Sequence, residues 1–452
     1  DAHLTSADLS RANLTDAELK FVLLMDANLT DANLTGANLL NATLTNANLT
    51  NVNLTNADLL GAYLRKAELT GANLDNADLS GALLSGAGVP GEGVRSGGIT
   101  GVPHRLPQDW KLVNGYLIGT DANLTSAALT NANLTNAQLH GARLWSATLT
   151  DANLTNARLT DTQLARVDLT DANLTGADLS GADLDSANLT DANLTNANLN
   201  DAIMLNVYMW GANLTQSTLN NAMLQDVNLT NATLTNAHLT NAHLTQTKLY
   251  GANLASVNFK DASLHDTDLS NADLTDAFMW GTHLTRPTLT GANLENVDMT
   301  FAHLTGVRSG GITGVPYELP QDWKLVEGYL VGPGANLSSA DLTDANLTNA
   351  NLNDAILTDA YMWGADLTHS TLKNVTLTDG NLTNANLTNA ELQFANLTNT
   401  NLFGADLSNA DLTGASLASS TLTGITGAAK YNSETILPAG FDPVAAGWTL
   451  IS

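Results

Sequence analysis

The chain has 452 residues, carries 17 Lys and Arg against 44 Asp and Glu for a formal net charge of −27, and contains no Cys. The lack of Cys excludes disulfides, thiolate nucleophiles and Cys-ligated zinc, and the acidic balance argues against nucleic acid and anionic membranes, whose binding needs basic surface. No apolar run approaches the roughly 20 residues of a membrane-spanning helix. Because the sequence starts at Asp1 without a Met or a charged-then-apolar leader, we expect a processed protein or a fragment of a longer one.

One five-residue unit fills most of the sequence. Leu recurs at almost every fifth position from 4 to 84, from 124 to 304 and, in a shifted register, from 337 to 422. Other apolar residues replace it at Met204, Met209, Phe259, Met279 and Met299. Ala lies two residues before nearly every Leu, so the unit reads A-(N/D)-L-T-(N/D/G) and repeats about seventy times over roughly four-fifths of the chain.

A five-residue period predicts a chain that turns a corner in every unit. On an α-helix, five steps of about 100° scatter successive Leu around the cylinder, and on a flat strand an odd period sends them to alternate faces. Four corners close a square coil of about 20 residues, which stacks on the next coil at about 4.8 Å. We expect Ala and Leu to face inward and the other three positions to face solvent, with about 1.5–3 kcal/mol per buried Leu outweighing the poor strand propensity of Asn, Ala and Asp.

The run DANLTDANLTGANL at residues 26–39 resembles the pentapeptide-repeat proteins. The resemblance implies an all-β fold, a right-handed quadrilateral parallel β-helix, which two spacer segments interrupt in this chain. It leaves the function open, because the family includes topoisomerase-protecting DNA mimics, secreted proteins and many members without a known role.

The two spacers are near-copies of each other. Residues 94–119 read VRSGGITGVPHRLPQDWKLVNGYLIG and residues 307–332 read VRSGGITGVPYELPQDWKLVEGYLVG, while a diverged third copy lies within residues 425–451. They resemble the spacers of long secreted bacterial pentapeptide-repeat proteins. We expect the Trp of each copy to plug or flank the last coil before it: Trp110, Trp323 and Trp448. The predicted modules, each a repeat block with its spacer, are residues 1–119, 120–332 and 333–452.

The way in which each internal spacer joins the next coil predicts how whole subunits assemble. Each internal spacer is followed at once by a new block, whereas the first coil has no capping helix before it, so its strand edges would be exposed. We therefore expect the spacer end of one subunit to meet the first coil of the next, a head-to-tail contact that does not close and so builds a homopolymer. A monomer whose cap lies outside this sequence is the alternative.

Many units place Asn before Leu and Thr after it, which is the acceptor pattern for N-glycosylation. The outward Asn residues that are candidates for covalent glycans are Asn13, Asn28, Asn33, Asn48, Asn53, Asn123, Asn133, Asn153, Asn173, Asn188, Asn193, Asn213, Asn228, Asn336, Asn346, Asn381, Asn386 and Asn396. The spacing places five of them, at 133, 153, 173, 193 and 213, in one row. The alternative is that Asn recurs here because stacked amides form hydrogen-bonded ladders.

Aromatic residues are few, and several gather at outward positions. The predicted contact patches pair one aromatic residue with another two positions on: Tyr208 with Trp210, Phe278 with Trp280, and Tyr361 with Trp363. Exposed apolar clusters mark contacts with another chain or with the flat faces of sugars. Packing beneath a folded-back spacer is the other interpretation.

The sequence offers little that indicates catalysis. His283 and His303 lie one predicted coil apart without carboxylate support, so we expect solvated surface and no metal site. Gly97 and Gly98 are too short a run for a phosphate loop, and no Ser/His/Asp arrangement stands out from so biased a composition. We expect no enzyme and no cofactor.

Two functions from different classes remain. The first is an extracellular or cell-surface structural rod that polymerises or builds a surface layer and is N-glycosylated, with no nucleic-acid partner and no membrane span. The alternative is a DNA mimic that binds a topoisomerase, or an unassigned binding scaffold. About 18 coils and the spacers span roughly 90 Å, so the net charge gives one charge per about 3.3 Å, against about 1.7 Å in duplex DNA, which favours the structural rod.

Overall fold

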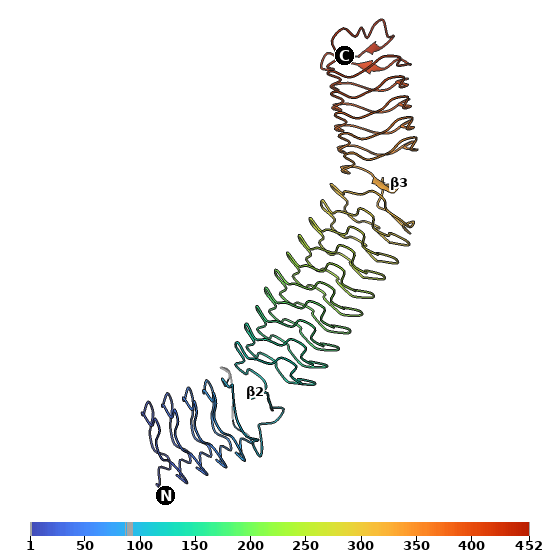
Figure 1. Cartoon of the computed structure of the whole chain (residues 1–452). Coiled ribbons are helices and arrows are strands. Elements are labelled where there is room, and N and C mark those ends of the chain that lie inside the picture. Colours follow the sequence, from blue (N-terminus) through green and yellow to red (C-terminus); the bar gives the residue numbers. More distant parts are fainter. Residues whose placement is uncertain (1, 86, 88–93, 452) are drawn as a thin grey trace. The chain divides into compact units, whose positions relative to one another are not determined.

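The computed structural model describes residues 2–85, 87 and 94–451. The chain divides into two units, Asp1–Thr233 and Leu234–Ser452. Within each unit the backbone winds as a stack of similar coils (Figure 1). The described residues contain no α-helix, and none of their segments could cross a membrane as a helix. Parallel β-bridges join the coils, so each unit is a β-helix.

The five positions of a unit have distinct environments. In the unit Ala27–Asp31, Ala27 and Leu29 are buried, Asn28 and Thr30 are half-buried, and Asp31 is exposed. Asp31 has a φ of 58° and so occupies the left-handed region, where the chain turns its corner. Asn, Asp and Gly tolerate this conformation best. The N/D/G preference at the fifth position is therefore a requirement of the corner.

Neighbouring coils are held together by backbone hydrogen bonds in a fixed register. The amide of Leu29 donates to the carbonyl of Asn48 at 2.8 Å, and the amide of Asn28 donates to the carbonyl of Ala7 at 2.9 Å. Bridges join Asn28 to Asn48 in the same way, so partners in the repeat blocks are 20 positions apart. Each face contributes one bridged residue between corners, which satisfies the buried backbone without long strands.

The interior is a column of Leu and Ala side chains. After the first coil, both are almost completely buried in the blocks, as at Leu174 and Ala172. Where a hydroxyl residue replaces the inward Ala, its proton has an acceptor: the Thr162 hydroxyl donates to the carbonyl of Leu139 at 2.8 Å and that of Ser217 to Leu214 at 2.7 Å. A buried hydroxyl without a partner would be costly, so these bonds let the column tolerate the replacement.

The only strands longer than two residues in the described ranges lie in the spacers. In the first spacer β1 (Lys111–Val113) pairs antiparallel with β2 (Tyr116–Ile118), and in the second β3 (Lys324–Val326) pairs with β4 (Tyr329–Val331). Two residues with positive φ connect the strands of the first hairpin, Asn114 at 50° and Gly115 at 79°. This is the backbone that a two-residue hairpin turn needs.

The predicted position of the spacer Trp agrees with the structure. Trp110 is half-buried and packs against the apolar core of the block before it. Its indole lies against the backbone of Gly119, where an added Cβ would overlap the ring, and Trp323 lies against Gly332 in the same way. Glycine is needed here because the ring occupies the space of a side chain.

The third copy of the spacer folds differently. Its strands β5 (Lys430–Tyr431) and β6 (Thr449–Leu450) pair in parallel, and no hairpin like that of the other spacers forms in its described residues. Trp448 is buried and contacts the ring of Phe441 at a centroid distance of 5.0 Å. This copy lacks the GYLIG-like segment that supplies the second strand of the other spacers.

Candidate functional site

The Asn residues of the N-L-T pattern form a local turn with their own Thr. In one such triplet the side-chain oxygen of Asn28 accepts hydrogen bonds from the amide of Thr30 at 3.1 Å and from its hydroxyl at 2.7 Å. Asn153 and Thr155 repeat this geometry at 3.0 and 2.6 Å. The turn uses only the oxygen of the Asn, so it leaves the amide nitrogen, the atom to which a glycan would be attached.

All the candidate Asn residues lie at outward positions, but their exposure differs. Exposed in the structure are Asn13, Asn48, Asn133, Asn153, Asn346 and Asn396. The others are half-buried, namely Asn28, Asn33, Asn53, Asn123, Asn173, Asn188, Asn193, Asn213, Asn228, Asn336, Asn381 and Asn386. Bridges link positions 133, 153, 173, 193 and 213 in succession, so the row predicted from the spacing runs along one face.

Some of the half-buried amides also bond to the preceding coil, although to Thr hydroxyls and not to another amide as the ladder interpretation expects. The side-chain nitrogen of Asn188 donates to the hydroxyl of Thr170 at 2.8 Å, and that of Asn33 donates to Thr15 at 3.1 Å. An amide nitrogen held in such a bond is a poor acceptor for a glycan in the folded chain. The geometry therefore distinguishes candidates whose amide nitrogen is held by the preceding coil, such as Asn188 and Asn33, from Asn153, which is exposed and makes no such bond among the described residues.

Asp at the same position forms the same turn as a charged acceptor. The carboxylate of Asp406 accepts hydrogen bonds from the Ser408 hydroxyl at 2.6 Å and from its amide at 2.9 Å. These bonds, the hydroxyl first, hold the pKa of Asp406 below its ordinary value, against a smaller opposite effect of burial. Asp406 therefore keeps its negative charge to lower pH than an ordinary Asp does.

The predicted aromatic patches lie on the surface. Tyr208 and Trp210 are exposed, as are Tyr361 and Trp363. Phe278 is exposed to 37%. The interpretation that a folded-back spacer covers Tyr208 or Tyr361 therefore finds no support in the described residues. Whether these residues contact a partner stays a prediction.

Trp280 differs from the other patch residues because neighbouring side chains contact its ring. It is half-buried, and its ring meets the edge of Phe301 at a centroid distance of 5.5 Å and an interplanar angle of 77°. On its other side the ammonium of Lys260 lies 5.2 Å from the ring centroid. These contacts orient the indole and, through it, the ring of Phe301.

The two histidines considered as metal ligands stack on each other. The rings of His283 and His303 lie 4.8 Å apart at an interplanar angle of 14°. No group of three or more His, Asp or Glu side chains in the described part of the chain is arranged to hold a metal ion.

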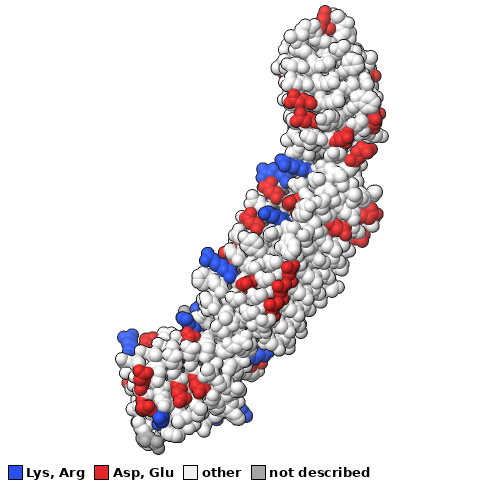
Figure 2. All heavy atoms as spheres, in the orientation of Figure 1, with Lys and Arg blue, Asp and Glu red and all other residues white. Residues whose placement is uncertain are grey.

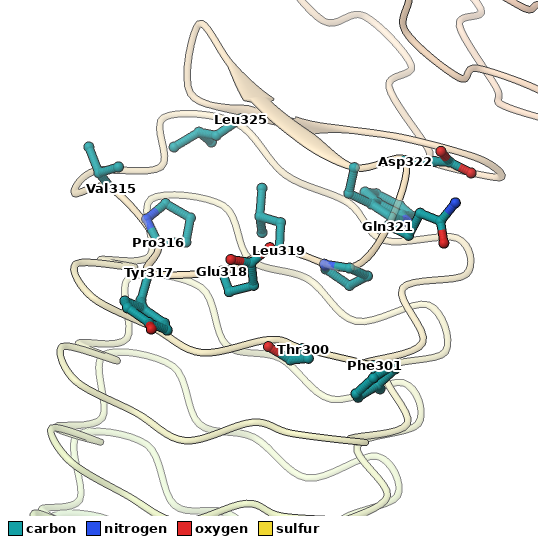
Figure 3. A pocket seen from close by; sticks show the side chains of 12 residues that line it. Thr300, Phe301, Val315, Pro316, Tyr317, Glu318, Leu319, Gln321, Asp322 and Leu325 are labelled. Carbon is teal, nitrogen blue, oxygen red and sulfur yellow. The ribbon is translucent and has the colours of Figure 1, made fainter.

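Sequence reasoning missed a large hollow of the second unit. A groove of about 1000 Å³ lies between the coil that carries Thr300 and Phe301 and the spacer segment 315–325 (Figure 3). It continues into a second hollow of about 530 Å³ along residues 301–305, and both share Phe301, Pro320, Gln321 and Trp323. We call the two together the spacer groove. One sequence signal was available: Phe301 occupies a corner where the repeat otherwise prefers Asn, Asp or Gly.

Aromatic, aliphatic and polar side chains line the spacer groove. Phe301 is 67% exposed and Tyr317 is 75% exposed, while Trp323 is half-buried. The carboxylate of Glu318 has no hydrogen-bond or ion-pair partner among the described residues, and Gln321, further along the groove, is exposed. The lining contains no Lys or Arg. The groove is therefore a mildly acidic, aromatic surface with free polar groups.

A stack of coils with a Leu and Ala interior and polar outer walls defines a solenoid scaffold. The family model for pentapeptide repeats matches residues 1–31, 23–59, 47–86, 120–156, 152–191, 237–276, 262–300, 335–374, 371–403 and 380–418, and that for a pentapeptide repeat region matches residues 182–254. Together these matches cover well over half of the sequence. The chain belongs to the pentapeptide-repeat family, whose members are generally non-enzymatic binding scaffolds with a right-handed β-helix.

Several solved structures are similar to this chain. HetL, a pentapeptide repeat protein involved in heterocyst differentiation regulation in the cyanobacterium Nostoc sp. strain PCC 7120, is 24% identical over 61% of this chain and 86% of its own, with a TM-score of 0.18. Rfr23 from the cyanobacterium Cyanothece 51142 is 28% identical over 33% of this chain and 90% of its own, with a TM-score of 0.21. QnrB1, a plasmid-mediated fluoroquinolone resistance protein, is 19% identical over 38% and 90%, with a TM-score of 0.30. No curated protein matches the chain.

Proposed function

We propose that this chain is a structural scaffold without catalytic activity, a β-helical rod of an extracellular or cell-surface layer. The observation that carries the proposal is the contrast between interior and wall. Leu and Ala are buried in every block, whereas the wall repeats Asn, Thr and Asp in rows. Most of the chain's residues therefore build either the buried column or the solvent-facing wall of the coils.

The proposed rod consists of square coils of about 20 residues, grouped into the modules 1–119, 120–332 and 333–452. Support comes from the bridges between residues 20 positions apart in the blocks. The shared hairpins at Lys111–Ile118 and Lys324–Val331 support spacers that end the first two modules. Limited proteolysis tests this division: we expect first cuts within the spacers, and early cuts inside the blocks would contradict the modular description.

We propose further that the rods join head-to-tail. The support is the internal joint, at which a spacer carries a new coil directly: the amide of Asn123 donates to the carbonyl of Val94 at 3.1 Å, and Asn336 donates to Val307 at 2.9 Å. The same joint between two molecules would extend without closing.

Sedimentation and electron microscopy over a concentration series test the joint. We expect fibres, and we expect Leu9→Lys to abolish them because Leu9 is a half-buried apolar residue of the first coil. Glu18→Lys, which changes an outward residue of the same coil, is the matched control. A chain that stays monomeric at every concentration would rule out head-to-tail assembly.

Glycans on the exposed Asn residues are the remaining part of the proposal. Asn153 is exposed and its amide nitrogen has no partner among the described residues, whereas that of Asn188 is bonded to Thr170. Intact-mass analysis of native material should exceed the polypeptide mass by multiples of a sugar unit, and peptide mapping should find Asn153 occupied and Asn188 bare. Thr155→Ala, which retains Asn153, should remove that glycan. A native mass equal to the bare chain would disprove glycosylation.

The alternative is a DNA mimic that binds a topoisomerase, or an unassigned binding scaffold. The net charge of −27 favours a mimic. On the face seen in Figure 2, however, acidic residues occur in small separated groups among uncharged ones, without the even spacing of a phosphate backbone. A supercoiling assay with a bacterial topoisomerase tests the alternative: inhibition by the chain at micromolar concentration would favour the mimic over the rod.

A further inference from the structure

We propose that the spacer groove of the second unit binds an uncharged oligosaccharide. The groove lies beneath residues 315–325 of the spacer and above residues 300–305 of the last regular coil before it. Its larger part, about 1000 Å³, is at the upper end of the range for small-ligand sites. A groove open along its length suits a chain of sugar rings better than a single compact ligand.

The aromatic rings supply the first half of sugar recognition. The faces of aromatic rings are electron-rich, so they attract the weakly positive C–H groups that cover one face of a sugar ring. Phe301 and Tyr317 are more than two-thirds exposed, and Figure 3 shows one on the coil and the other on the spacer segment. The edge contact with Trp280 fixes the ring of Phe301 before any ligand arrives. A pre-oriented ring loses little entropy on binding.

Polar side chains supply the second half. Sugar hydroxyls need acceptors and donors, and the groove offers the unpartnered carboxylate of Glu318 and the exposed amide of Gln321. The Thr300 hydroxyl donates to Asp298 at 2.6 Å, so its oxygen remains free to accept. Asp322 accepts one bond, from Asn351 at 3.3 Å, and has further lone pairs. These groups are mostly acceptors, which suits a ligand rich in hydroxyl donors.

The charge of the lining selects among sugars. Glu318 and Asp322 are acidic, and neither hollow is lined by Lys or Arg. A uronic acid or a sulfated sugar would meet like charge without a compensating cation. The ligand class is therefore an uncharged saccharide, and acidic ones are excluded by the same carboxylates that bind hydroxyls.

The backbone of the groove argues against an extended peptide as the ligand. Peptides that add to a surface as strands use unpaired backbone groups. Here the amides of Tyr317 and Glu318 both donate to the carbonyl of Val297, at 2.9 and 3.3 Å, and that of Trp323 donates to Pro320 at 3.1 Å. Pro316 and Pro320 have no amide hydrogen. The segment thus presents no continuous edge of free backbone groups to which a strand could add, and recognition rests mainly on side chains, as in sugar binding.

The first spacer provides a natural comparison. Where the second spacer has Tyr317 and Glu318, the first has His104 and Arg105 within the same surrounding sequence. Both pairs are compatible with the spacer fold, because Arg105 bridges with Leu83 as Glu318 bridges with Asp298. Exchanging the pair should change ligand recognition and leave the spacer fold unchanged.

The experiment uses the full chain on an array of uncharged, amino-bearing and acidic oligosaccharides, followed by titration calorimetry with the best uncharged binder. We expect saturable binding of an uncharged oligosaccharide. The double variant Tyr317→His with Glu318→Arg and the single variant Phe301→Asn should each weaken it at least tenfold. Asn is the residue that such corners prefer, so Phe301→Asn keeps the fold. Phe394→Asn makes the same change at another corner, where φ is also 59°, and should leave binding unchanged.

Several outcomes would overturn the proposal. They are no saturable binding by any uncharged oligosaccharide, binding that both groove variants retain, and stronger binding of acidic or amino-bearing sugars than of uncharged ones. A Pro- and Arg-containing peptide library is measured in parallel, and capture of a peptide that the groove variants lose would assign the groove to peptides instead.

Discussion

The two internal spacers, residues 94–119 and 307–332, differ at four positions, and the second lines a groove of about 1000 Å³. Both make the same internal bonds. The hydroxyl of Ser96 accepts the amide of Leu117 at 2.8 Å, and that of Ser309 accepts the amide of Leu330 at 2.9 Å. The shared residues therefore build the joint between blocks, and the residues that differ decide what the joint presents to solvent.

The segments before the spacers also differ. Arg95 bridges with Asn73, which is 22 positions earlier, whereas Arg308 bridges with Thr288, which is 20 positions earlier. The segment before the first spacer is thus two residues longer than the segment before the second. In addition, its sequence does not match that of the regular coil that forms the floor of the groove before the second spacer. A common joint can in this way carry different surfaces, which the following predictions test.

Removal of the spacer Trp should have the largest effect on the joint. Trp323→Ala and Trp110→Ala should each lower the local opening free energy by about 3 kcal/mol, because each leaves a cavity beside the last coil. Hydrogen exchange of the full chain at residues 328–337 and 115–124 measures this locally. Trp323→Phe, which retains a flat ring, should lose less. Very different losses at the two sites would break the equivalence of the spacers.

Overpacking of the same contact should be the next largest effect. Gly332→Ala places a methyl group where the indole of Trp323 lies, and should destabilise the joint by about 1–3 kcal/mol. In the Trp323→Ala background the same change should be nearly neutral, since the ring is gone. Hydrogen exchange on the two single variants and the double variant measures this coupling. Additive losses would show that the ring is not the cause.

Much of the fold could be predicted from the sequence because one pattern dictates it. A Leu at every fifth position has one geometric solution, and the family confirms the β-helix that the pattern predicted. The corner was visible as the N/D/G preference, but its left-handed backbone was not recognised. The sequence also contains Asn114 followed by Gly115, which is typical of a hairpin turn, but the hairpin was not predicted from it.

The spacer groove could not be predicted, for a physical reason. Periodicity determines which side chains face inward, but the hollow exists because the segment around Tyr317 folds back above Phe301, and that packing has no period. The exposed Asn rows were predicted in part. Position alone predicted that Asn153 and Asn188 face outward, whereas the hydrogen bond that distinguishes them depends on the coil before each.

A smaller effect is expected from removing the hydrogen bond that joins each spacer to the block that follows it. The hydroxyl of Tyr116 accepts the amide of Ala128 at 3.0 Å, and that of Tyr329 accepts the amide of Asp341 at 3.1 Å. Tyr116→Phe and Tyr329→Phe should each cost about 0.5–1 kcal/mol of local stability, because the amide loses its acceptor and, in an exposed residue, water replaces it only in part. Faster exchange should be confined to Ala128 in one variant and Asp341 in the other. Unchanged exchange at both would remove this bond from the shared joint.

The smallest effect should come from an ion pair that only the first spacer makes among the described residues. The guanidinium of Arg95 lies 3.1 Å from the carboxylate of Asp75, and 65% of its side chain is exposed, whereas Arg308 has no such partner. Exposed pairs contribute about 0–1 kcal/mol and weaken with salt. Asp75→Asn should therefore accelerate exchange around residue 95 less than tenfold at low salt and not at all at about 1 M salt, where the two spacers should become alike. A loss that persists at high salt would mean that Asp75 supports the joint by its hydrogen bonds, and the two spacers would then differ in construction as well as in surface.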